Sequence, residues 1–304
     1  MTADAASSAP PTKPCIGVIG AGRVGAVLAA GLTAAGYPLA AVAGESDASR
    51  TRIETLLPGV RIDKPTAVSR AAEILLLTVP DDTLDNVVRM LVASGAIRSG
   101  QIVVHTSGRH GLGVLRPAVG VGARGIALHP AMTFTGTDLD LERLASCTYG
   151  VTCASEDQSI AEALVTGLGG RLVAVSEANR ELYHAALAHG SNHLVTLVSQ
   201  AIDLLRSADA EDPALVLRPL LSAALDNALA FGDAALTGPI VRGDVESVAA
   251  HLRSLAAQSP ATVQSYVVLA RATASRAVAA GRLEPRRAAA MVEVLNDALA
   301  GLSA

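Results

Sequence analysis

The 304-residue sequence predicts an α/β domain with a mainly parallel sheet, followed by an all-α domain. Between Cys15 and about Ser176, short apolar runs rich in β-branched residues alternate with helical stretches, which is typical of parallel βαβ units. Beyond Ser176 this strand signal stops, and the chain continues as helices rich in Ala and Leu. The length also suits two domains, since a domain has roughly 100–200 residues.

The expected strands of the first half are short and apolar. They are Cys15–Ile19, Leu39–Ala43, Ile74–Val79, Ile102–His105, Gly125–His129, Tyr149–Cys153 and Leu172–Val175, with a further short strand at Val60–Ile62. Helices are expected between them at Arg23–Ala35, Ala48–Leu57, Thr83–Ala93 and Glu156–Leu168, and several of these are followed by a glycine that ends the helix. Together these elements predict an open sheet.

The second half is expected to begin with a long helix, from Ala178 to about Ser207, which would span roughly 45 Å and connect the domains. Further helices are expected at Pro213–Ala235, Asp244–Gln258, Ala261–Ala280 and Glu284–Leu302. We therefore divide the chain into three parts: a disordered tail at 1–13, which is small, polar and interrupted by prolines, an α/β domain at 14–176 and a helical domain at 177–304.

The composition excludes several classes of function. Lys and Arg number 24 and Asp and Glu 28, so the net charge of −4 does not favour nucleic acid or an anionic membrane as a partner. The longest apolar runs, such as Ile74–Pro80 and Leu172–Val175, fall short of the roughly 20 residues that a membrane-spanning helix needs. Cys15, Cys147 and Cys153 are too few for a disulfide framework or a paired-cysteine zinc site. We expect a cytoplasmic protein.

A glycine-rich turn is the most specific local feature, because it follows an expected strand and opens an expected helix. Gly20 permits a tight turn, Gly22 lets the backbone approach a pyrophosphate, and Gly25 lets helix and strand pack closely. The helix N-terminus presents N–H groups to phosphate. No Lys-Ser or Lys-Thr pair follows that would indicate a nucleoside-triphosphate loop. Residues 14–176 are therefore expected to form a dinucleotide-binding Rossmann domain, with the coenzyme held by Gly20, Ala21, Gly22, Arg23, Val24 and Gly25.

The residues after the second expected strand bear on the choice between NAD and NADP. The Glu45 carboxylate could accept hydrogen bonds from the adenine ribose, which favours NAD. Ser46, Ser49, Arg50 and Arg52 could instead hold the 2′-phosphate of NADP. A solvated charged turn is the alternative interpretation of these arginines. The expected cofactor is therefore NADP or NAD, with the preference left open.

Polar residues also gather where three expected strands end. In open α/β sheets ligands bind outside the carboxyl ends of the strands. Val79, Pro80, Ser107 and His129 lie at such ends and are candidate cofactor-binding residues on the nicotinamide side. The alternative for His105 and His129 is that each ring only satisfies backbone groups in a tight turn.

The long helix at the start of the second half carries a possible polar stripe. At 100° per residue, His184 and Ser191 fall within roughly 20° of each other and Asn192 about 80° away, so all three could face a cleft. Plain helix packing is the alternative. His189 and His193 have a spacing that metal ligands use, but no third ligand is identifiable, so no metal site is expected.

The helical half is interrupted at Thr237–Asp244, where glycines and a proline break the helix. Arg242 in this segment could grip a substrate carboxylate with two parallel hydrogen bonds, and an exposed loop arginine is the alternative. Asp244 is a suitable N-cap for the next helix.

These motifs together resemble a bacterial family of oxidoreductases that joins a Rossmann-like domain to a helical domain named DUF2520. The resemblance runs from about residue 14 to 257 and rests on residues 20–25, 105–108, 128–130, 183–184, 191–192 and 237–244. In plan this family is similar to 6-phosphogluconate dehydrogenase-like proteins and pyrroline-5-carboxylate reductases, whose helical halves dimerise. Some relatives are regarded as alternative ketopantoate reductases of pantothenate biosynthesis. The resemblance therefore implies a homodimer formed through the helical domain, with ketopantoate as the leading substrate.

Two positions depart from the related families. Hydroxyacid dehydrogenases carry a catalytic lysine one turn before an asparagine, whereas Ala188 stands four residues before Asn192 here. Only Asn192 is therefore carried over from them. Family members often have an arginine where Glu45 stands, which weakens the implied preference for NADP.

We expect an NAD(P)-dependent reductase that acts on the carbonyl of a small 2-oxo acid. In this hypothesis His184 is the general acid, Ser191 and Asn192 orient the carbonyl, and Arg242 holds the substrate carboxylate. One alternative is a non-catalytic sensor or scaffold that binds a dinucleotide without turnover. Another is a cyclic imine reductase of the pyrroline-5-carboxylate reductase type.

Overall fold

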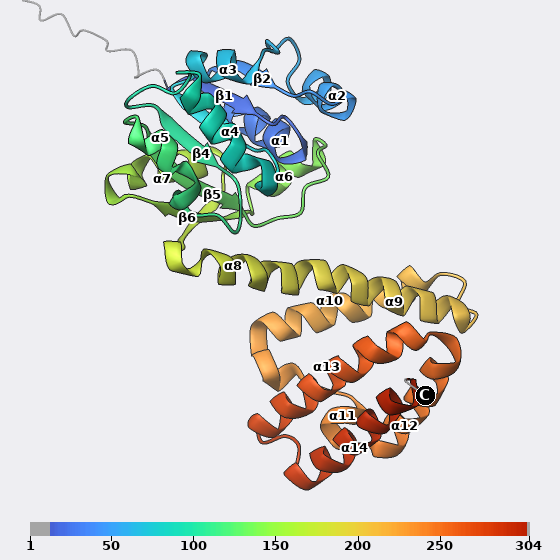
Figure 1. The fold of residues 1–304 in the computed structure, drawn as a ribbon. Helices are drawn as coiled ribbons and strands as arrows, with labels where there is room; N and C mark the ends of the chain where they lie inside the picture. The colour runs from blue at the N-terminus through green and yellow to red at the C-terminus, as the bar shows by residue number, and fades with distance from the viewer. Residues whose placement is uncertain (1–12, 303–304) are drawn as a thin grey trace, which may run out of the picture. The chain divides into compact units, whose positions relative to one another are not determined.

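The computed structural model describes residues 13–302, and the expected tail lies outside them apart from Lys13. The chain forms two compact units, of which the first ends at Gly190 and the second begins at Ser191 (Figure 1). This division lies later than residue 176, the boundary expected from composition. The reason is that α8 (Arg180–Leu187) belongs to the first unit, where its side chains form hydrogen bonds with the sheet.

The first unit contains a seven-stranded sheet in the order β2-β1-β3-β4-β5-β6-β7. Neighbouring strands are parallel except β5 and β6, which are antiparallel. The expected fold class, a mainly parallel α/β domain followed by an all-α domain, is confirmed. The expected strand at Val60–Ile62 is instead a single bridge between Val42 and Ile62. The strands are β1 (Ile16–Ile19), β2 (Leu39–Ala43), β3 (Ile74–Leu77), β4 (Ile102–His105), β5 (Arg124–Pro130), β6 (Thr148–Cys153) and β7 (Arg171–Ala174).

Helices cover both faces of this sheet. Side chains of α1, α6 and α7 pack on one face, and side chains of α3, α4 and α5 pack on the other. Three of them, α3, α5 and α6, were not expected, because helices of five to seven residues show little periodicity. The elements are α1 (Arg23–Ala34), α2 (Asp47–Leu56), α3 (Pro65–Ala71), α4 (Asp81–Ala93), η1 (Leu112–Leu115), α5 (Arg116–Gly120), α6 (Leu139–Leu144), η2 (Ser155–Asp157), α7 (Gln158–Gly167) and η3 (Glu177–Asn179).

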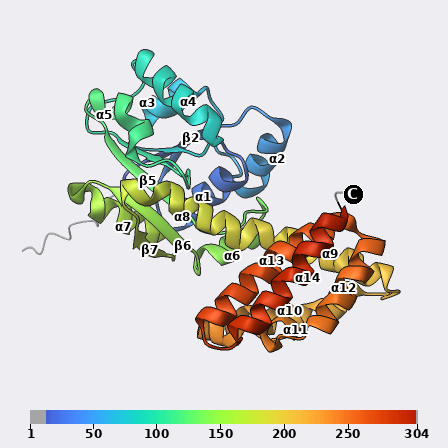
Figure 2. The same ribbon diagram turned by 60° about the horizontal axis from the view of Figure 1, so that its bottom comes forward.

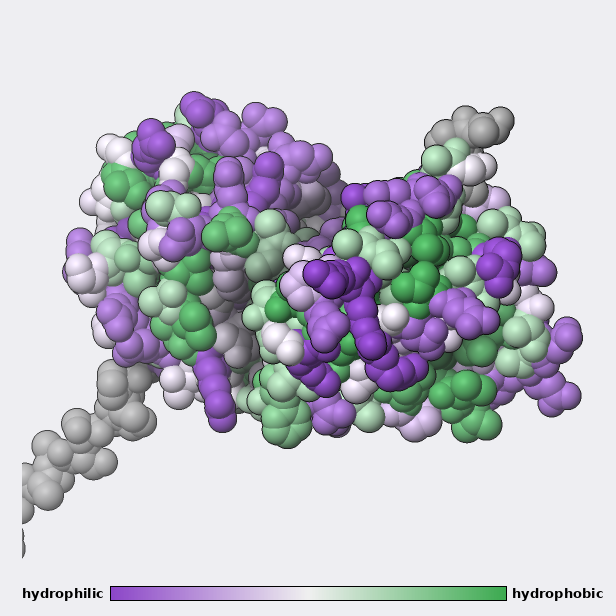
Figure 3. Space-filling view, turned by 90° about the horizontal axis from the view of Figure 1, so that it is seen from below, coloured by the Kyte–Doolittle hydropathy of each residue, from purple (hydrophilic) through white to green (hydrophobic). Residues whose placement is uncertain are grey.

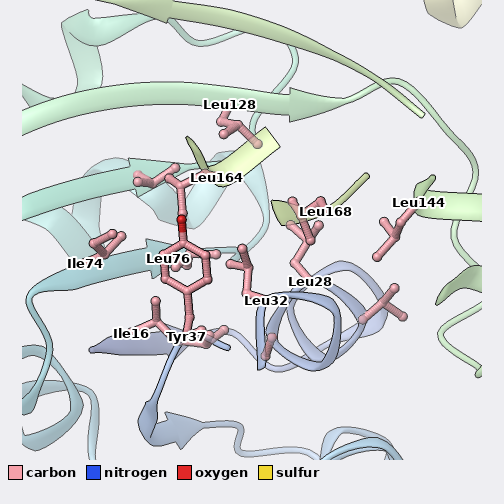
Figure 4. Close-up of a cluster of buried hydrophobic side chains, with 14 of the residues drawn as sticks. Ile16, Leu28, Leu32, Tyr37, Ile74, Leu76, Leu128, Leu144, Leu164 and Leu168 are labelled. Atoms are coloured by element: carbon pink, nitrogen blue, oxygen red, sulfur yellow. The ribbon is translucent and has the colours of Figure 1, made fainter. Parts of the chain in front are cut away.

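Both faces of the sheet are apolar. Successive strand residues point to opposite sides, and in these strands consecutive residues are apolar. Ile74 and Leu76 of β3 join the cluster formed with α1 and α7, whereas Leu75 and Leu77 join the cluster formed with α4. Figure 4 shows the first of these clusters, with Leu28 of α1 among the labelled side chains. Burial on both sides explains why the strands can be recognised as uninterrupted apolar runs.

Helices are the only regular secondary structure in the part of the second unit that the structure describes (Figure 2). Its core gathers side chains of α12, α13 and α14, among them Leu252, Val267 and Leu295. Asp212 and Asp244 each accept a hydrogen bond from a backbone N–H three residues later, which fixes where α10 and α12 begin. A π-helical turn (Ala188–Asn192) spans the division between the two units. The elements that follow it are α9 (His193–Ser207), α10 (Pro213–Phe231), η5 (Gly232–Ala235), α11 (Pro239–Arg242), α12 (Val245–Gln258), α13 (Pro260–Ala279) and α14 (Pro285–Leu302).

By length and composition alone, the helical run Pro213–Arg242 resembles a membrane-spanning segment. Its mean hydropathy is 1.4 over an apolar window of which 0% is buried. The sequence-based expectation differed because it considered only consecutive apolar residues. The run is not one helix, since it breaks at Gly232 and Gly238, where φ is +56° and +95°. Apolar side chains stand at the surface of α10. Hydrophobic side chains also reach the surface among hydrophilic ones on the face drawn in Figure 3.

Candidate functional site

The carboxyl ends of β1 and β3 meet where the strand order reverses. β1 lies between β2 and β3, so the chain first passes from β1 to β2 on one side and then crosses to β3 on the other side of β1. Ligands of open α/β sheets bind in the crevice at such a point. A cleft of about 670 Å³ lies here, lined by the glycine turn after β1 and by residues that follow β2, β3 and β4.

Each of the three glycines of the turn is suited to its position for a different structural reason. Gly20 has a φ of +96°, and a side chain there would meet the backbone of Thr78 and Val79 at 2.8 Å. Gly25 lies against the Gly20 carbonyl and the Thr78 side chain, so a larger residue would push α1 away from the turn. Gly22 leaves open space, with only the Gly20 carbonyl oxygen nearby at 3.8 Å. The turn therefore presents bare backbone to the cleft.

Most of the residues predicted to bind a coenzyme line this cleft. The first turn of α1 has no side-chain cap at Gly22, which leaves its N–H groups available to an anion. Ala21 and Gly25 are buried behind the turn, and His129 is not part of the cleft wall. The predicted residues that line the cleft are Gly20, Gly22, Arg23, Val24, Glu45, Ser46, Val79, Pro80 and Ser107.

Charges of both signs lie beyond β2. Glu45 is exposed and borders both the main cleft and an adjoining hollow of about 370 Å³ that Arg50 and Lys64 also line. Ser46 caps α2 by accepting a hydrogen bond from the backbone N–H of Ser49. Arg52 instead donates to a carbonyl within α2. A carboxylate that suits the adenine ribose of NAD and a guanidinium that suits the 2′-phosphate of NADP thus lie at the same end of the cleft. The structure is compatible with either coenzyme.

His105 has no ring nitrogen left for a ligand. Nε2 donates to the carbonyl oxygen of Gly111 at 2.9 Å, and Nδ1 accepts from the backbone N–H of Ser107 at 3.2 Å. Burial lowers the pKa of His105 to about 4, so the ring is neutral at pH 7. His105 therefore shapes the loop after β4, which is the alternative that the sequence had left open for it.

His129, Tyr183 and His184 form a cluster within the first unit. The Tyr183 hydroxyl and Nδ1 of His129 lie 3.0 Å apart, and the ring centroids of His129 and His184 are separated by 6.1 Å. A side chain at Gly108 would meet both histidine rings, so this glycine makes room for them. Burial lowers the pKa of His129 to about 4 and raises the pKa of Tyr183. Both groups of this pair are neutral at pH 7.

The register of β5 and β6 explains how the cluster is built. His129 of β5 lies opposite Gly150 of β6. A side chain at Gly150 would come within 2.5 Å of the Tyr183 hydroxyl oxygen. The glycine therefore leaves a slot in which the Tyr183 ring meets His129 edge-on, with centroids 5.6 Å apart.

Arg180 is a site residue that the sequence analysis missed. It lies on the same helix as Tyr183 and His184, and its side chain is only 1% exposed. Nε donates to Oγ1 of Thr152 and Nη2 donates to the carbonyl oxygen of Ala127, at 2.8 and 2.7 Å. Its spacing of three and four residues from Tyr183 and His184 places all three on one helix face, and this spacing is the signal in the sequence that would have indicated it.

Ser191, Asn192 and Arg242 lie in the second unit. Ser191 and Asn192 belong to the π-helical turn Ala188–Asn192, so their angular spacing from His184, calculated for a continuous α-helix, is wrong. Asn192 and Arg242 are exposed within the structure. Asp244, the predicted N-cap, accepts hydrogen bonds from both the backbone and the hydroxyl of Ser247.

Neither metal ligands nor disulfides contribute to the described structure. Residues 13–302 contain no group of three or more His, Cys, Asp or Glu side chains that could hold a metal ion. Cys15, Cys147 and Cys153 are free thiols, and burial raises the pKa of each.

Comparison with known proteins finds two family matches and several similar folds. Residues 1–130 match the Rossmann-like domain, and residues 147–273 match the domain of unknown function DUF2520. No match was found among curated proteins. A candidate NADP oxidoreductase from Bacteroides fragilis is 21% identical with a TM-score of 0.74, covering 87% of this chain and 99% of its own. A protein from Thermotoga maritima is 20% identical with a TM-score of 0.64, covering 87% and 98%.

A pyrroline carboxylate reductase from Plasmodium falciparum with NADP bound is 13% identical with a TM-score of 0.57, covering 92% of this chain and 99% of its own. At such identities these structures show the fold alone. The two family matches lie side by side along the sequence, in the order that the motifs indicate. The chain therefore carries, in order, a match to the Rossmann-like domain and a match to the DUF2520 domain.

Proposed function

We propose that this protein is an NAD(P)-dependent reductase of a small 2-oxo acid, with ketopantoate as the first substrate to test. The glycine turn in front of the cleft at the switch point of the sheet carries this proposal. Bare backbone at Gly22 and the uncapped start of α1 suit a diphosphate. The similarity to folds named as an NADP oxidoreductase and a pyrroline carboxylate reductase supports the same class of cofactor.

The residues of the cleft fit a pyridine dinucleotide from one end to the other. The diphosphate would lie at Gly22 and Arg23, the adenine ribose at Glu45, and the nicotinamide beyond β4 near Ser107. When bound, the coenzyme supplies the hydride. The protein then has to position the carbonyl and provide a proton for its oxygen.

The cluster on α8 is suited to that proton chemistry. When the Tyr183 hydroxyl donates to Nδ1 of the neutral His129 ring, the proton on Nε2 is free to polarise a carbonyl oxygen. His184, beside that ring, is the proposed general acid.

The test is coenzyme binding by calorimetry on the full chain, followed by NADPH or NADH oxidation with a panel of 2-oxo acids that includes ketopantoate. Turnover is expected, and His184→Gln and Tyr183→Phe should each lower kcat by about 100-fold at unchanged coenzyme affinity. If neither coenzyme binds, the proposal is wrong. Binding without turnover across the panel would favour a sensor or scaffold instead.

The fold similarity to pyrroline carboxylate reductase makes a cyclic imine reductase the second candidate. Its substrate is also a small carboxylate, but the double bond to be reduced is C=N. Adding pyrroline-5-carboxylate to the same panel separates the two functions. Oxidation of the coenzyme with pyrroline-5-carboxylate but with none of the 2-oxo acids would identify the imine reductase.

A further inference from the structure

Arg180 differs from the other buried charged residues in the described structure. Asp140 and Asp157 are also buried, and each has an arginine as its ion-pair partner, Arg143 and Arg124. Arg180 has no carboxylate within ion-pair distance among residues 13–302, and its Nη1 is buried without any hydrogen-bond partner there. One guanidinium is thus buried with only two neutral acceptors, Thr152 Oγ1 and the Ala127 carbonyl.

Such an arrangement is costly for a protein that only needs to fold. A buried hydrogen-bonding group without a partner costs about 1–3 kcal/mol, and more when it is charged. Burial lowers the pKa of Arg180, which expresses the same penalty on the charged form. An apolar residue at this position would avoid the cost, so the unmatched charge points to an anionic ligand.

A hollow of about 380 Å³ lies beside Arg180, between α4, the loop after β4 and the start of α8. Most acidic groups around it are already engaged. Glu177 accepts hydrogen bonds from the backbone N–H groups of Leu112 and Gly113, and Asp85 pairs with Arg89. Glu181 is exposed, where water and salt screen its charge.

Positive groups also border the hollow. Arg109 lies on its wall and pairs with Asp81 at 3.3 Å, and Asp81 lines the main cleft. The hollow and the main cleft therefore adjoin across the Asp81–Arg109 ion pair. A ligand in the hollow would lie next to the expected nicotinamide end of the main cleft.

We propose that Arg180 binds the substrate carboxylate, with an oxygen of that carboxylate accepting a hydrogen bond from Nη1. This inference rests on the proposed function, because it takes the substrate to be a small oxo or imino acid. In a 2-oxo acid the carboxylate carbon is bonded directly to the carbonyl carbon that is reduced, so the anion anchor and the proton donor must be close together. The Arg180 guanidinium carbon lies 6.0 Å from the centre of the ring of Tyr183, which pairs with His129 and precedes the proposed general acid His184 in the sequence.

Arg180 thereby replaces Arg242 as the residue that holds the carboxylate. Arg242 is exposed at the end of a helix of four residues, where water already solvates its charge. A guanidinium that is already desolvated pays less to bind an anion than an exposed one does.

The experiment uses oxamate, which is an anionic analogue of a 2-oxo acid, and oxamide as its uncharged counterpart. Both are titrated calorimetrically into the full-length chain, with and without NADPH. The variants are Arg180→Lys, Arg180→Gln and Arg242→Gln. Thr152→Val serves as the matched control, because it removes the Nε acceptor of Arg180 but leaves the guanidinium in place.

Wild-type protein is expected to bind oxamate and not oxamide. Both Arg180 variants should lose about 10- to 100-fold in oxamate affinity, since hydrogen bonds to charged groups have that strength. Arg242→Gln and Thr152→Val should change it by less than about threefold, and coenzyme affinity should stay unchanged in all variants.

Three results would overturn the inference. They are a lack of oxamate binding by the wild type, an equal loss in Thr152→Val and Arg180→Gln together with a lower Tm, and a loss confined to Arg242→Gln. Each of these can occur while NADPH still binds, so failure of this inference is distinguishable from failure of the proposed reductase. Conversely, oxamate binding without binding of either NADPH or NADH would support the anion site and contradict the reductase.

Discussion

His105 and His129 both lie at the carboxyl edge of the sheet and both are kept neutral by burial, but only His129 has a ring nitrogen left for a ligand. Gly111 and Ser107 occupy the two nitrogens of His105. Nε2 of His129 has no hydrogen-bond partner among the described residues, while Nδ1 meets Tyr183. The sequence could place both histidines at strand ends, but it could not show which ring is already saturated, because that depends on how the following loop folds.

The buried His105 ring predicts a pH dependence of stability. Its folded pKa of about 4 lies below the ordinary value of 6.5, so the unfolded chain binds the proton more readily. The stability due to the neutral ring is complete above pH 6.5 and is lost as the pH falls toward 4, with a loss of about 2 kcal/mol between pH 7 and pH 5. Urea unfolding of the wild type and of His105→Gln at both pH values measures it. The variant should lose that part of the pH dependence, and equal slopes for the two proteins would contradict the prediction.

At the scale of elements, the strands and the long helices were predictable and the short helices were not. β2 and β4 match the predicted limits because uninterrupted apolar runs mark strands buried on both faces. The antiparallel pairing of β5 with β6 has no such local signal, since a strand buried on both faces reads alike in either direction. The π-helical turn before α9 is equally invisible to a pattern that assumes a constant angle per residue.

The glycine turn and α1 act as one element, and this predicts the effect of a small substitution. Gly25→Ala should force α1 away from the Gly20 carbonyl and the Thr78 side chain, lowering coenzyme affinity at least about tenfold. Gly120→Ala in α5 is the matched control, because no atom lies within 4 Å of the added carbon and its φ is ordinary. Coenzyme titration of both variants checks this. Wild-type affinity in Gly25→Ala would show that the close approach is unimportant.

At the scale of the whole molecule, the exposed apolar surface of α10 indicates an interface with another protein chain. Its apolar side chains stand largely in solvent, with Leu220 at 63% and Leu229 at 80% exposure. Exposed apolar surface of this extent is typical of an interaction site. We propose that a second copy of the chain covers it, because the family resemblance implies a homodimer through the helical domain.

The dimer proposal makes a prediction about mass in solution. Sedimentation at micromolar concentration should give a dimer for the wild type and a monomer for the double variant Leu220→Asp and Leu229→Asp, since two buried carboxylates would oppose association. Val268→Asp on α13 is the control, because Val268 is 64% exposed and lies outside α10. A monomeric wild type, or a double variant that stays dimeric, would show that α10 is not the interface.

The pairing of His129 with Gly150 limits how this protein can change in length during evolution. Insertions in the connection between β5 and β6 leave both strands in register and are compatible with a working cluster. A one-residue deletion within β6 would turn the side chains on one side of the deletion to the other face of the sheet. Another residue of β6 (Thr148–Cys153) would then take the place of Gly150 and bring a bulkier side chain into the slot for Tyr183. Homologues with this chemistry should therefore vary in the loop and keep the strand constant.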